Sequence, residues 1–320
     1  MSRVYASLPL TGPAGSGGRD VLRGAELACE RADAGAVELI ALDSYSAERE
    51  KTAIRNARRA AADDEATAYL GDFHSSQVAK TAAILAEAGL LQVAPVATMV
   101  GLEGRTLVRL MPDDAAGAQA IAHWLVQIGI ERLLVVHDHD RGYGVPVGAM
   151  CADAARSRGL EVRSRPVWDD GERVAADLGH AEAVLYVGVA GSGAVSLWHE
   201  LHAASPGMWL LGSDGVAREW LARSLEPSAA ERTRFFVAHR APLAFYGFEG
   251  MSLILDCVAA GGGDRAAAAE AARTGRHRDS ILGRYSIDET GGTTSLAYGR
   301  LAVVDGELVW DSAHLQGTGK

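Results

Sequence analysis

The chain has 320 residues, more than one ordinary domain, and 48% of them are hydrophobic while 22% are charged, as in a well-packed globular protein. The formal net charge of −10 argues against nucleic-acid binding, which normally needs a basic face to neutralise phosphates. No run approaches the ~20 consecutive apolar residues that a membrane span requires. The opening Met1–Tyr5 lacks the basic and apolar segments of a secretion signal, so we expect either a cytoplasmic protein or an exported one whose signal was removed.

Short apolar, β-branched runs alternate with amphipathic segments along most of the chain. The expected strands are 4–8, 37–42, 67–70, 91–94, 133–137, 161–165, 183–187 and 209–211. The expected helices are 19–32, 47–63, 76–88, 114–128, 145–158, 193–204 and 218–225. Near-continuous apolar strands separated by helices predict an α/β fold with parallel sheets covered on both faces.

The order of these segments indicates two lobes. Four strand–helix units precede Leu107–Pro112, and a second series starts after a crossing near Asp113–Ala116. After Phe235–His239 the pattern changes. It predicts helices over 245–260 and 265–274, then β-structure over 283–287, 296–304 and 307–310 with a hairpin turn at Asp305-Gly306.

Glycine clusters at two strand-to-helix turns are candidates for phosphate or catalytic loops. Gly12–Gly18 lacks the Lys and the following Ser or Thr of a Walker loop, so a permissive ligand-facing turn that includes Ser16 is favoured over nucleotide binding. Gly188–Gly193 contains Ser192, but its spacing does not match G-x-S-x-G, and a tight turn is favoured over a nucleophile elbow. We therefore expect no cofactor and no catalytic residue.

Metal binding is also disfavoured. His137–Asp140 offers donor types suited to a metal, but adjacent residues at a strand end point in different directions, so a polar loop is expected. Cys29, Cys151 and Cys257 are far apart and match neither a metal motif nor a disulfide framework. Buried, chemically silent cysteines are expected.

Polar side chains follow several predicted strands, where open α/β sheets bind their ligands. They are Ser75, Ser76, Thr98, Tyr143 and Asp214. Each has a structural alternative, such as a helix N-cap for the serines or a plain loop residue for Asp214. Together, hydroxyls from the first lobe and an acid with a tyrosine from the second predict a site for a zwitterion, with Asp214 holding the ammonium group.

Several short motifs resemble, in the right order, the leucine/isoleucine/valine-binding family of ABC-transporter solute receptors, which are type I periplasmic binding proteins. The resemblance covers nearly the whole chain and is carried by Leu8–Pro13, Gly24–Ala28, Tyr69–Ser76, Val93–Thr98, Arg109–Asp114, Val135–Asp138 with Tyr143-Gly144, and Leu211–Gly215.

The resemblance implies two doubly wound lobes joined by a three-segment hinge near Ala115, Arg240 and Tyr298. Residues 1–115 and 241–298 would form lobe one, and 116–240 and 299–320 would form lobe two. A membrane permease would be the partner.

The resemblance also implies roles for individual residues. Ser75, the backbone of Val96, and Thr98 would bind the carboxylate of an amino-acid-like ligand. Asp214 would bind the amine, and Tyr143 would cover the ligand. Secondary candidates near the ligand are Ser16, Phe73, Ser76, Val189 and Phe245.

Some residues depart from the family pattern. Gly17 and Val189 replace aromatic residues that often wall the side-chain pocket in relatives, and Asp214 is shorter than the usual Glu. Ser46 and His74 stand where relatives may carry a cysteine pair. The pocket is therefore expected to be roomier, unless Phe73 or Phe245 fills the space.

The leading hypothesis is an extracytoplasmic solute receptor that closes around an amino acid and delivers it to a permease. The alternatives are a cytoplasmic ligand sensor of the same fold and, least favoured, a hydrolase.

Overall fold

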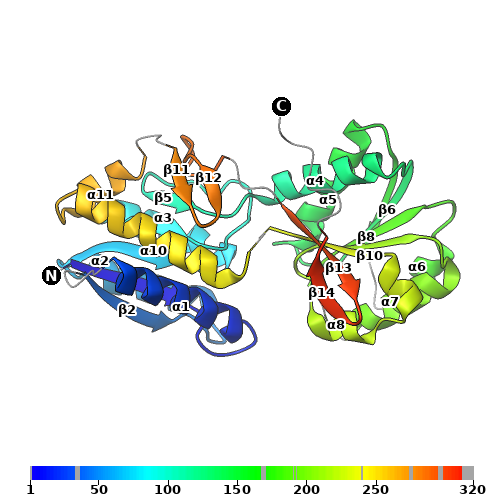
Figure 1. Ribbon diagram of the computed structural model, residues 1–320, viewed down its shortest axis with the longest axis horizontal. Helices are drawn as coiled ribbons and strands as arrows, with labels where there is room; N and C mark the ends of the chain where they lie inside the picture. Colours follow the sequence, from blue (N-terminus) through cyan, green and yellow to red (C-terminus); the bar gives the residue numbers. More distant parts are fainter. Residues whose placement is uncertain are drawn as a thin grey trace. The chain divides into compact units, whose positions relative to one another are not determined.

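The computed structural model describes residues 2–32, 37–166, 171–189, 191, 193–238, 241–273, 277–294 and 298–311. The chain divides into two compact units, shown in Figure 1. The first unit comprises Met1–Asp113 and Ala241–Leu296, and the second comprises Asp114–Arg240 and Ala297–Lys320. The chain therefore passes from one unit to the other three times.

The first unit is built on a five-stranded parallel sheet in the order β2–β1–β3–β4–β5. Its strands are β1 (Ser2–Leu8), β2 (Val37–Asp43), β3 (Ala66–Gly71), β4 (Leu91–Ala94) and β5 (Leu107–Arg109). Its helices are α1 (Gly15–Arg31), α2 (Arg49–Ala61), α3 (Ser75–Glu87), α10 (Leu243–Ala260) and α11 (Arg265–Ala271), and a separate antiparallel pair joins β11 (Arg278–Ser280) to β12 (Gly283–Tyr285). In this order the topology reverses between β1 and β3, which is where open α/β sheets bind ligands.

The second unit repeats this order in a larger sheet, β14–β13–β10–β9–β8–β6–β7. Its parallel part consists of β6 (Arg132–His137), β7 (Glu161–Pro166), β8 (Ala183–Val187), β9 (Trp209–Gly212) and β10 (Thr233–Val237). An antiparallel hairpin of β13 (Gly299–Val304) and β14 (Glu307–Trp310) extends it. Its helices are α4 (Asp114–Gln127), α5 (Gly144–Ser157), α6 (Gly171–Ala176), α7 (Gly193–Ala204), α8 (Glu219–Ser224) and α9 (Pro227–Glu231). The reversal here falls between β6 and β8.

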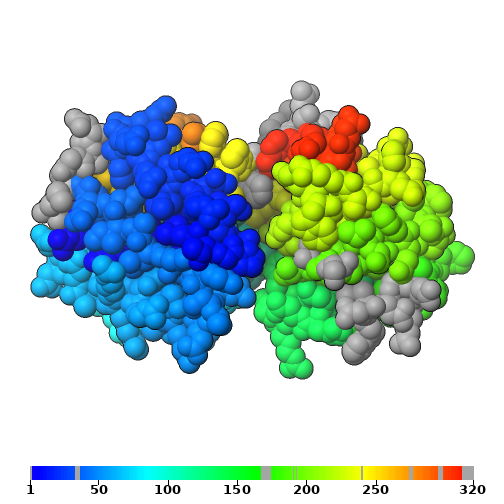
Figure 2. Space-filling model, turned by 90° about the horizontal axis from the view of Figure 1, so that it is seen from below, coloured from blue at the N-terminus to red at the C-terminus, as the bar shows by residue number. Residues whose placement is uncertain are grey.

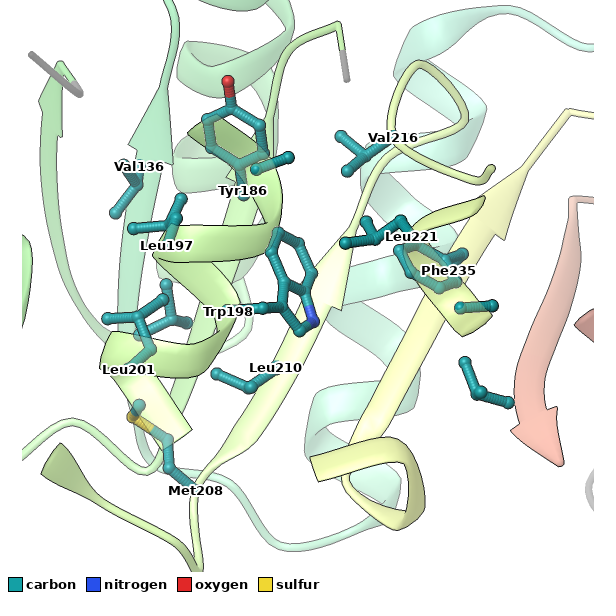
Figure 3. Close-up of a cluster of buried hydrophobic side chains, with 14 of the residues drawn as sticks. Val136, Tyr186, Leu197, Trp198, Leu201, Met208, Leu210, Val216, Leu221 and Phe235 are labelled. Atoms are coloured by element: carbon teal, nitrogen blue, oxygen red, sulfur yellow. The ribbon is translucent and has the colours of Figure 1, made fainter. Parts of the chain in front are cut away.

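Both faces of the second sheet are buried, which explains its apolar strands. Along β6, Leu133 and Val135 pack with α4 and α5, while Leu134 and Val136 pack on the opposite face. In Figure 3 the indole of Trp198 lies at the centre of that opposite face. Trp198 is 1% exposed, and its Nε1 donates to the Thr233 hydroxyl at 3.2 Å, so its one polar atom is satisfied.

The C-terminal hairpin packs on its own unit. β13 contacts α9 and β14 contacts α8. In Figure 2 the red hairpin adjoins yellow-green residues of the same unit. The hairpin is anchored by Asp311, which accepts from Arg234 and Arg300, each at 2.8 Å.

Helix α10 is the one helix in the described part of the chain that is long and apolar enough to cross a membrane by length and composition. It packs on α1 and on β3 and β4 of the first unit. Its one deeply buried acid, Glu249, accepts from the Tyr285 hydroxyl at 2.7 Å and is paired with Arg278. These contacts are those of a core helix.

Two glycines bring α1 and α10 into close contact. A Cβ built on Gly24 would lie 1.8 Å from the Ala244 carbonyl oxygen, and one on Gly247 would lie 1.9 Å from the Val21 carbonyl oxygen. No real Cβ approaches backbone so closely, so the helices must separate to admit any side chain at these positions.

Replacing Gly247 with alanine is expected to destabilise the protein by about 1–3 kcal/mol through overpacking. In an ordinary helix interior the same substitution would stabilise the helix by about 1 kcal/mol, because alanine has the higher helix propensity. Urea unfolding measures the change. Gly207→Ala is the matched control, because a Cβ there meets no atom within 4 Å. Equal stability of the two variants would contradict the close helix contact.

A buried hydrogen-bond network lies at the β1–β3 reversal of the first unit. The Asp72 carboxylate is fully buried and accepts from the hydroxyls of Ser7 at 2.7 Å, Tyr69 at 3.2 Å and Thr81 at 2.9 Å. Gln92 Nε2 donates to the Thr81 hydroxyl and to the Gly71 carbonyl. Burial raises the pKa of Asp72 to about 6, although the three hydroxyl donors act in the opposite direction.

This raised pKa predicts a pH-dependent loss of stability. Between about pH 4 and 6 the folded protein retains a proton on Asp72 that the unfolded chain has lost. The contribution of Asp72 is therefore complete below about pH 4 and declines as the pH rises through 6, by about 3 kcal/mol. The measurement is urea unfolding of the wild type and Asp72→Asn from pH 4 to 7.5. The stability difference between them should shrink or reverse with rising pH, and a constant difference would show that the pKa of Asp72 is not raised.

The structure confirms the predicted α/β class with two mainly parallel sheets, and the eight expected strands of the two parallel series are present. The short elements β5, β10, α6, α9 and β11 had not been predicted. At the C-terminal end, α11 stops at Ala271, β12 stops at Tyr285 and β13 starts at Gly299. These elements are shorter than the expected ranges, of which residues 274, 296 and 297 lie outside the described residues.

The glycine cluster at Gly12–Gly18 is only partly a loop. Helix α1 starts at Gly15, four residues earlier than expected, because the Gly18 N–H already bonds to the Ala14 carbonyl. A Cβ on Gly18 would lie 2.0 Å from the Pro9 carbonyl oxygen. This glycine therefore lets the first turn of the helix pack onto the end of β1.

Candidate functional site

The residues proposed for ligand binding fall into two groups, one in each unit, and most of them follow the carboxyl ends of strands. The first unit carries Ser16, Phe73, Ser75, Ser76, Val96, Thr98 and Phe245, and the second carries Tyr143, Val189 and Asp214. We call these groups the first and second half-sites.

In the first half-site, Ser75 connects two loops. It is the first residue of α3, which follows β3, and its hydroxyl oxygen accepts the backbone N–H groups of Thr98 at 3.1 Å and Met99 at 3.2 Å. Those two residues follow β4. The hydroxyl proton of Ser75 is not used in these bonds and is available to a ligand acceptor.

The other members of the first half-site differ in exposure. Thr98 is 9% exposed and Val96 is partly buried, so they present little more than a hydroxyl and backbone groups. Ser76 and Ser16 are exposed in the first turns of α3 and α1. Phe245, near the start of α10, is 38% exposed.

The aromatic ring of Phe73 lies over Gly17. A Cβ on Gly17 would lie 3.2 Å from Phe73 Cζ and 3.1 Å from Leu243 Cδ1. Phe73 also makes an edge contact with His74, with ring centroids 5.2 Å apart. The space beside Gly17, expected to leave room in the pocket, is thus taken by side chains of the same unit. Leu243 had not been singled out, since it lies in an apolar helix far away in sequence.

In the second half-site, Tyr143 and Asp214 are joined directly. Tyr143 is the N-cap residue of α5, and its hydroxyl donates a short hydrogen bond to Asp214, just beyond β9. The same carboxylate oxygen accepts the Gly215 N–H at 2.8 Å. Burial and the adjacent negative charge of Asp214 raise the pKa of Tyr143 well above its usual value, so the phenol remains a neutral donor.

A small cavity of about 10 Å³ lies inside the second unit next to this pair. Its lining includes Asp114, Cys151, Ser213 and Tyr298 in addition to Tyr143 and Asp214. That volume admits about one water molecule. An amino acid cannot fit there, so any such ligand of the second half-site must bind at its surface.

Hydrogen bonds of Asp138 account for the conformation of the His137–Asp140 segment. Its carboxylate accepts the Val189 N–H at 3.0 Å through one oxygen and the Asp140 N–H at 3.0 Å through the other. It thus ties the end of β6 to the end of β8 and holds Val189, whose side chain is 54% exposed. Among the described residues, no group of three or more His, Cys, Asp or Glu could hold a metal ion. Ser192 and Arg240 lie outside the described residues.

Removing the Ser75 hydroxyl should leave the N–H groups of Thr98 and Met99 without their acceptor. Ser75→Ala is expected to lower the free energy of unfolding by about 1–3 kcal/mol, because the two N–H groups would then be desolvated without a hydrogen-bond acceptor. The neighbouring Ser76→Ala is the control and should stay within about 0.5 kcal/mol, since Ser76 is exposed. Thermal and urea unfolding of both variants provide the comparison; a neutral Ser75→Ala would mean that water replaces the hydroxyl.

Two doubly wound α/β units with polar groups at their strand ends are the architecture of a two-lobed binding protein. The sequence profile of the periplasmic binding protein family matches residues 6–241, and the chain belongs to this family. Members of the family bind solutes and are not enzymes, so the protein is not a hydrolase. The search of curated proteins found no match.

Solved structures share the fold across nearly the whole chain. A leucine-binding protein from Thermotoga maritima is 20% identical with a TM-score of 0.81, and the match covers 98% of each chain. A substrate-binding protein from Desulfitobacterium hafniense in complex with Leu is 16% identical with a TM-score of 0.81, covering 97% of this chain and 99% of the other. A solute-binding protein from Rhodopseudomonas palustris in complex with 3,4-dihydroxybenzoic acid is 19% identical with a TM-score of 0.77, covering 96% and 94%. At these identities the likeness establishes the type I periplasmic binding protein fold.

Proposed function

We propose that the protein is the extracytoplasmic solute-binding component of an ABC transporter and that its ligand is an amino acid. Membership of the periplasmic binding protein family supports the transport role, and a membrane permease is then the partner that receives the ligand. The structural neighbours named above bind either leucine or an aromatic acid, so the ligand class has to be argued from the residues of this chain.

The observation that carries the amino-acid proposal is the carboxylate of Asp214. It stands at a strand end, and one of its oxygens accepts the Tyr143 hydroxyl and the Gly215 N–H. The nearby Arg218 guanidinium donates to the backbone carbonyl of Asp214 at 3.3 Å. A ligand ammonium group would bring a positive charge to this carboxylate, whereas a benzoate would bring a second negative charge to the same place.

The first half-site suits the opposite end of such a ligand. The Ser75 hydroxyl, the Thr98 hydroxyl and the backbone around Val96 lie on the loops that follow β3 and β4. Ser75 also opens α3, whose free N–H groups and dipole favour an anion. We assign the ligand carboxylate to this group and its ammonium to Asp214, with Tyr143 positioning the acid.

In this proposal the two units act as lobes that close on the ligand. Residues 1–115 with 241–298 and residues 116–240 with 299–320 would move as bodies about crossings near Ala115, Arg240 and Tyr298. Domain closure around a ligand is the usual motion of this architecture. Closure would let the two half-sites together exclude water from the ligand.

Binding experiments with Asp214→Asn test the assignment. Thermal-shift screening of amino acids and benzoates identifies ligands, and calorimetry then measures their affinities. Amino acids should bind the wild type, and Asp214→Asn should lose about 2–5 kcal/mol of binding because the ammonium is left buried and unpaired.

Asp153→Asn is the control for a lost surface charge, since Asp153 is exposed on α5 and is paired with Arg156. It should bind as the wild type does. Benzoate binding without amino-acid binding, or an Asp214→Asn affinity within threefold of the wild type, would refute the assignment.

A further inference from the structure

Helix α2 of the first unit is strongly basic, although the protein as a whole is acidic. The chain has 31 Lys and Arg against 41 Asp and Glu, whereas the 13 residues of α2 include five basic residues and one acid. The acid is Glu50, and the basic residues are Arg49, Lys51, Arg55, Arg58 and Arg59. The helix therefore carries a local charge opposite in sign to the net charge of the protein.

Three of these basic residues form a row on the exposed side of α2, which we call the basic stripe. Lys51, Arg55 and Arg58 are spaced i, i+4 and i+7, and all three are exposed. The buried residues of α2, which pack towards α3, β1 and β3, lie on the opposite side of the helix. They are Thr52, Ala53, Asn56, Ala57 and Ala60. The basic stripe therefore faces solvent.

The helix itself gives no reason for the basic stripe. Arg55 has Lys51 four residues before it and Arg58 three residues after it, and like charges at these spacings destabilise a helix. The helix dipole favours a cation at Arg58, in the last turn, but disfavours Lys51 in the first turn. Departures from such local preferences are expected mainly at functional sites.

Acidic neighbours do not neutralise the basic stripe. Within the described residues, neither Arg55 nor Arg58 pairs with a carboxylate, and Lys51 pairs with Glu48 through an exposed contact. Comparable exposed arginines of other helices each pair with an acid of their own helix. They are Arg23 of α1, Arg156 of α5 and Arg223 of α8. The contrast shows that the unpaired charge is a property of α2 and not of the surface in general.

We propose that the basic stripe is a docking surface for the anionic phospholipid headgroups of a membrane. No large apolar side chain is exposed on α2, all of whose residues are described, so the stripe lacks the apolar and aromatic anchors typical of a protein–protein interface. A layer of phosphate groups needs no such anchors, because each Lys or Arg close to it raises the affinity about fivefold through charge alone.

This inference goes beyond the proposed function, since it concerns neither the ligand nor the half-sites. Weak attraction to anionic lipid would keep a transport receptor close to the membrane that contains its permease.

Vesicle co-sedimentation tests the proposal. The probes are vesicles of phosphatidylcholine alone and vesicles in which about one third of the lipid is phosphatidylglycerol. At low salt the wild type should bind only the anionic vesicles, and about 150 mM salt should weaken this binding because it screens exposed charges. The combined variant Lys51→Gln, Arg55→Gln and Arg58→Gln should bind at least about tenfold more weakly. Circular dichroism checks that this variant is folded, as expected for changes at exposed positions.

The matched control combines Arg23→Gln, Arg156→Gln and Arg223→Gln. It changes the net charge of the protein by the same amount but leaves the basic stripe intact, so it should bind anionic vesicles nearly as tightly as the wild type. A further variant, Glu48→Gln, releases Lys51 from its acidic partner and should strengthen binding by up to about fivefold.

Two results would overturn the proposal directly. One is a wild type that does not bind anionic vesicles at low salt; the other is an equal loss of binding in the two triple variants, which would show that net charge decides. Binding to a DNA duplex without binding to anionic vesicles would also overturn it, in favour of a nucleic-acid surface. These measurements use no solute, so their outcome is independent of whether an amino acid binds at Asp214.

Discussion

The buried carboxylate of Asp72 holds together the segment on which the first half-site is built. Three hydroxyl groups from β1, β3 and α3 converge on it, so the end of one strand, the end of its neighbour and the following helix share one acceptor. An anion in an apolar interior is tolerated only when such donors surround it. The hydrogen bonds to Asp72 therefore fix the backbone of Gly71–Ser75, and with it the positions of Phe73 and Ser75.

In the second unit, a different aspartate joins the two strand ends at the topological reversal. There Asp138 lies just after β6 and binds the N–H of Val189 just after β8, so again a carboxylate ties the two strand ends at the topological reversal. This acid is partly exposed, and its donors are backbone amides instead of hydroxyls. Each unit thus uses an aspartate to hold together the carboxyl edge of its sheet, which gives Asp72 and Asp138 a structural role.

The regular part of this architecture was predictable because it depends on local pattern. Apolar runs such as Leu133–Val136 show no alternation because both faces of their sheet are buried, and that property is visible in the sequence. The strand β5 was missed because three residues carry too little pattern of their own and are defined by their neighbours in the sheet. The five-residue strand β10 was also missed, although it is as long as β8, which was predicted.

The candidate site was predictable only in part. Strand-end residues such as Ser75 and Asp214 are identifiable from their position after an apolar run. The contacts of Leu243 and Phe73 with Gly17 join segments more than 50 residues apart in sequence, so no local sequence pattern could predict them. The glycine at position 17 is informative only after the structure shows which ring it accommodates.

The two units share one strand order but present opposite chemistry at equivalent positions. After the fourth strand of each series, the first unit places the hydroxyl of Thr98, whereas the second places the carboxylate of Asp214. A repeated fold therefore gives two similar edges that differ in their side chains. In the proposed function the hydroxyls of the first edge would donate to an anion, and the carboxylate of the second would accept from a cation. In the proposed function a zwitterion would satisfy both groups, whereas an aromatic acid would leave Asp214 to be desolvated without a partner. That desolvation cost is the physical reason for proposing an amino acid as the ligand, although structural neighbours bind both classes.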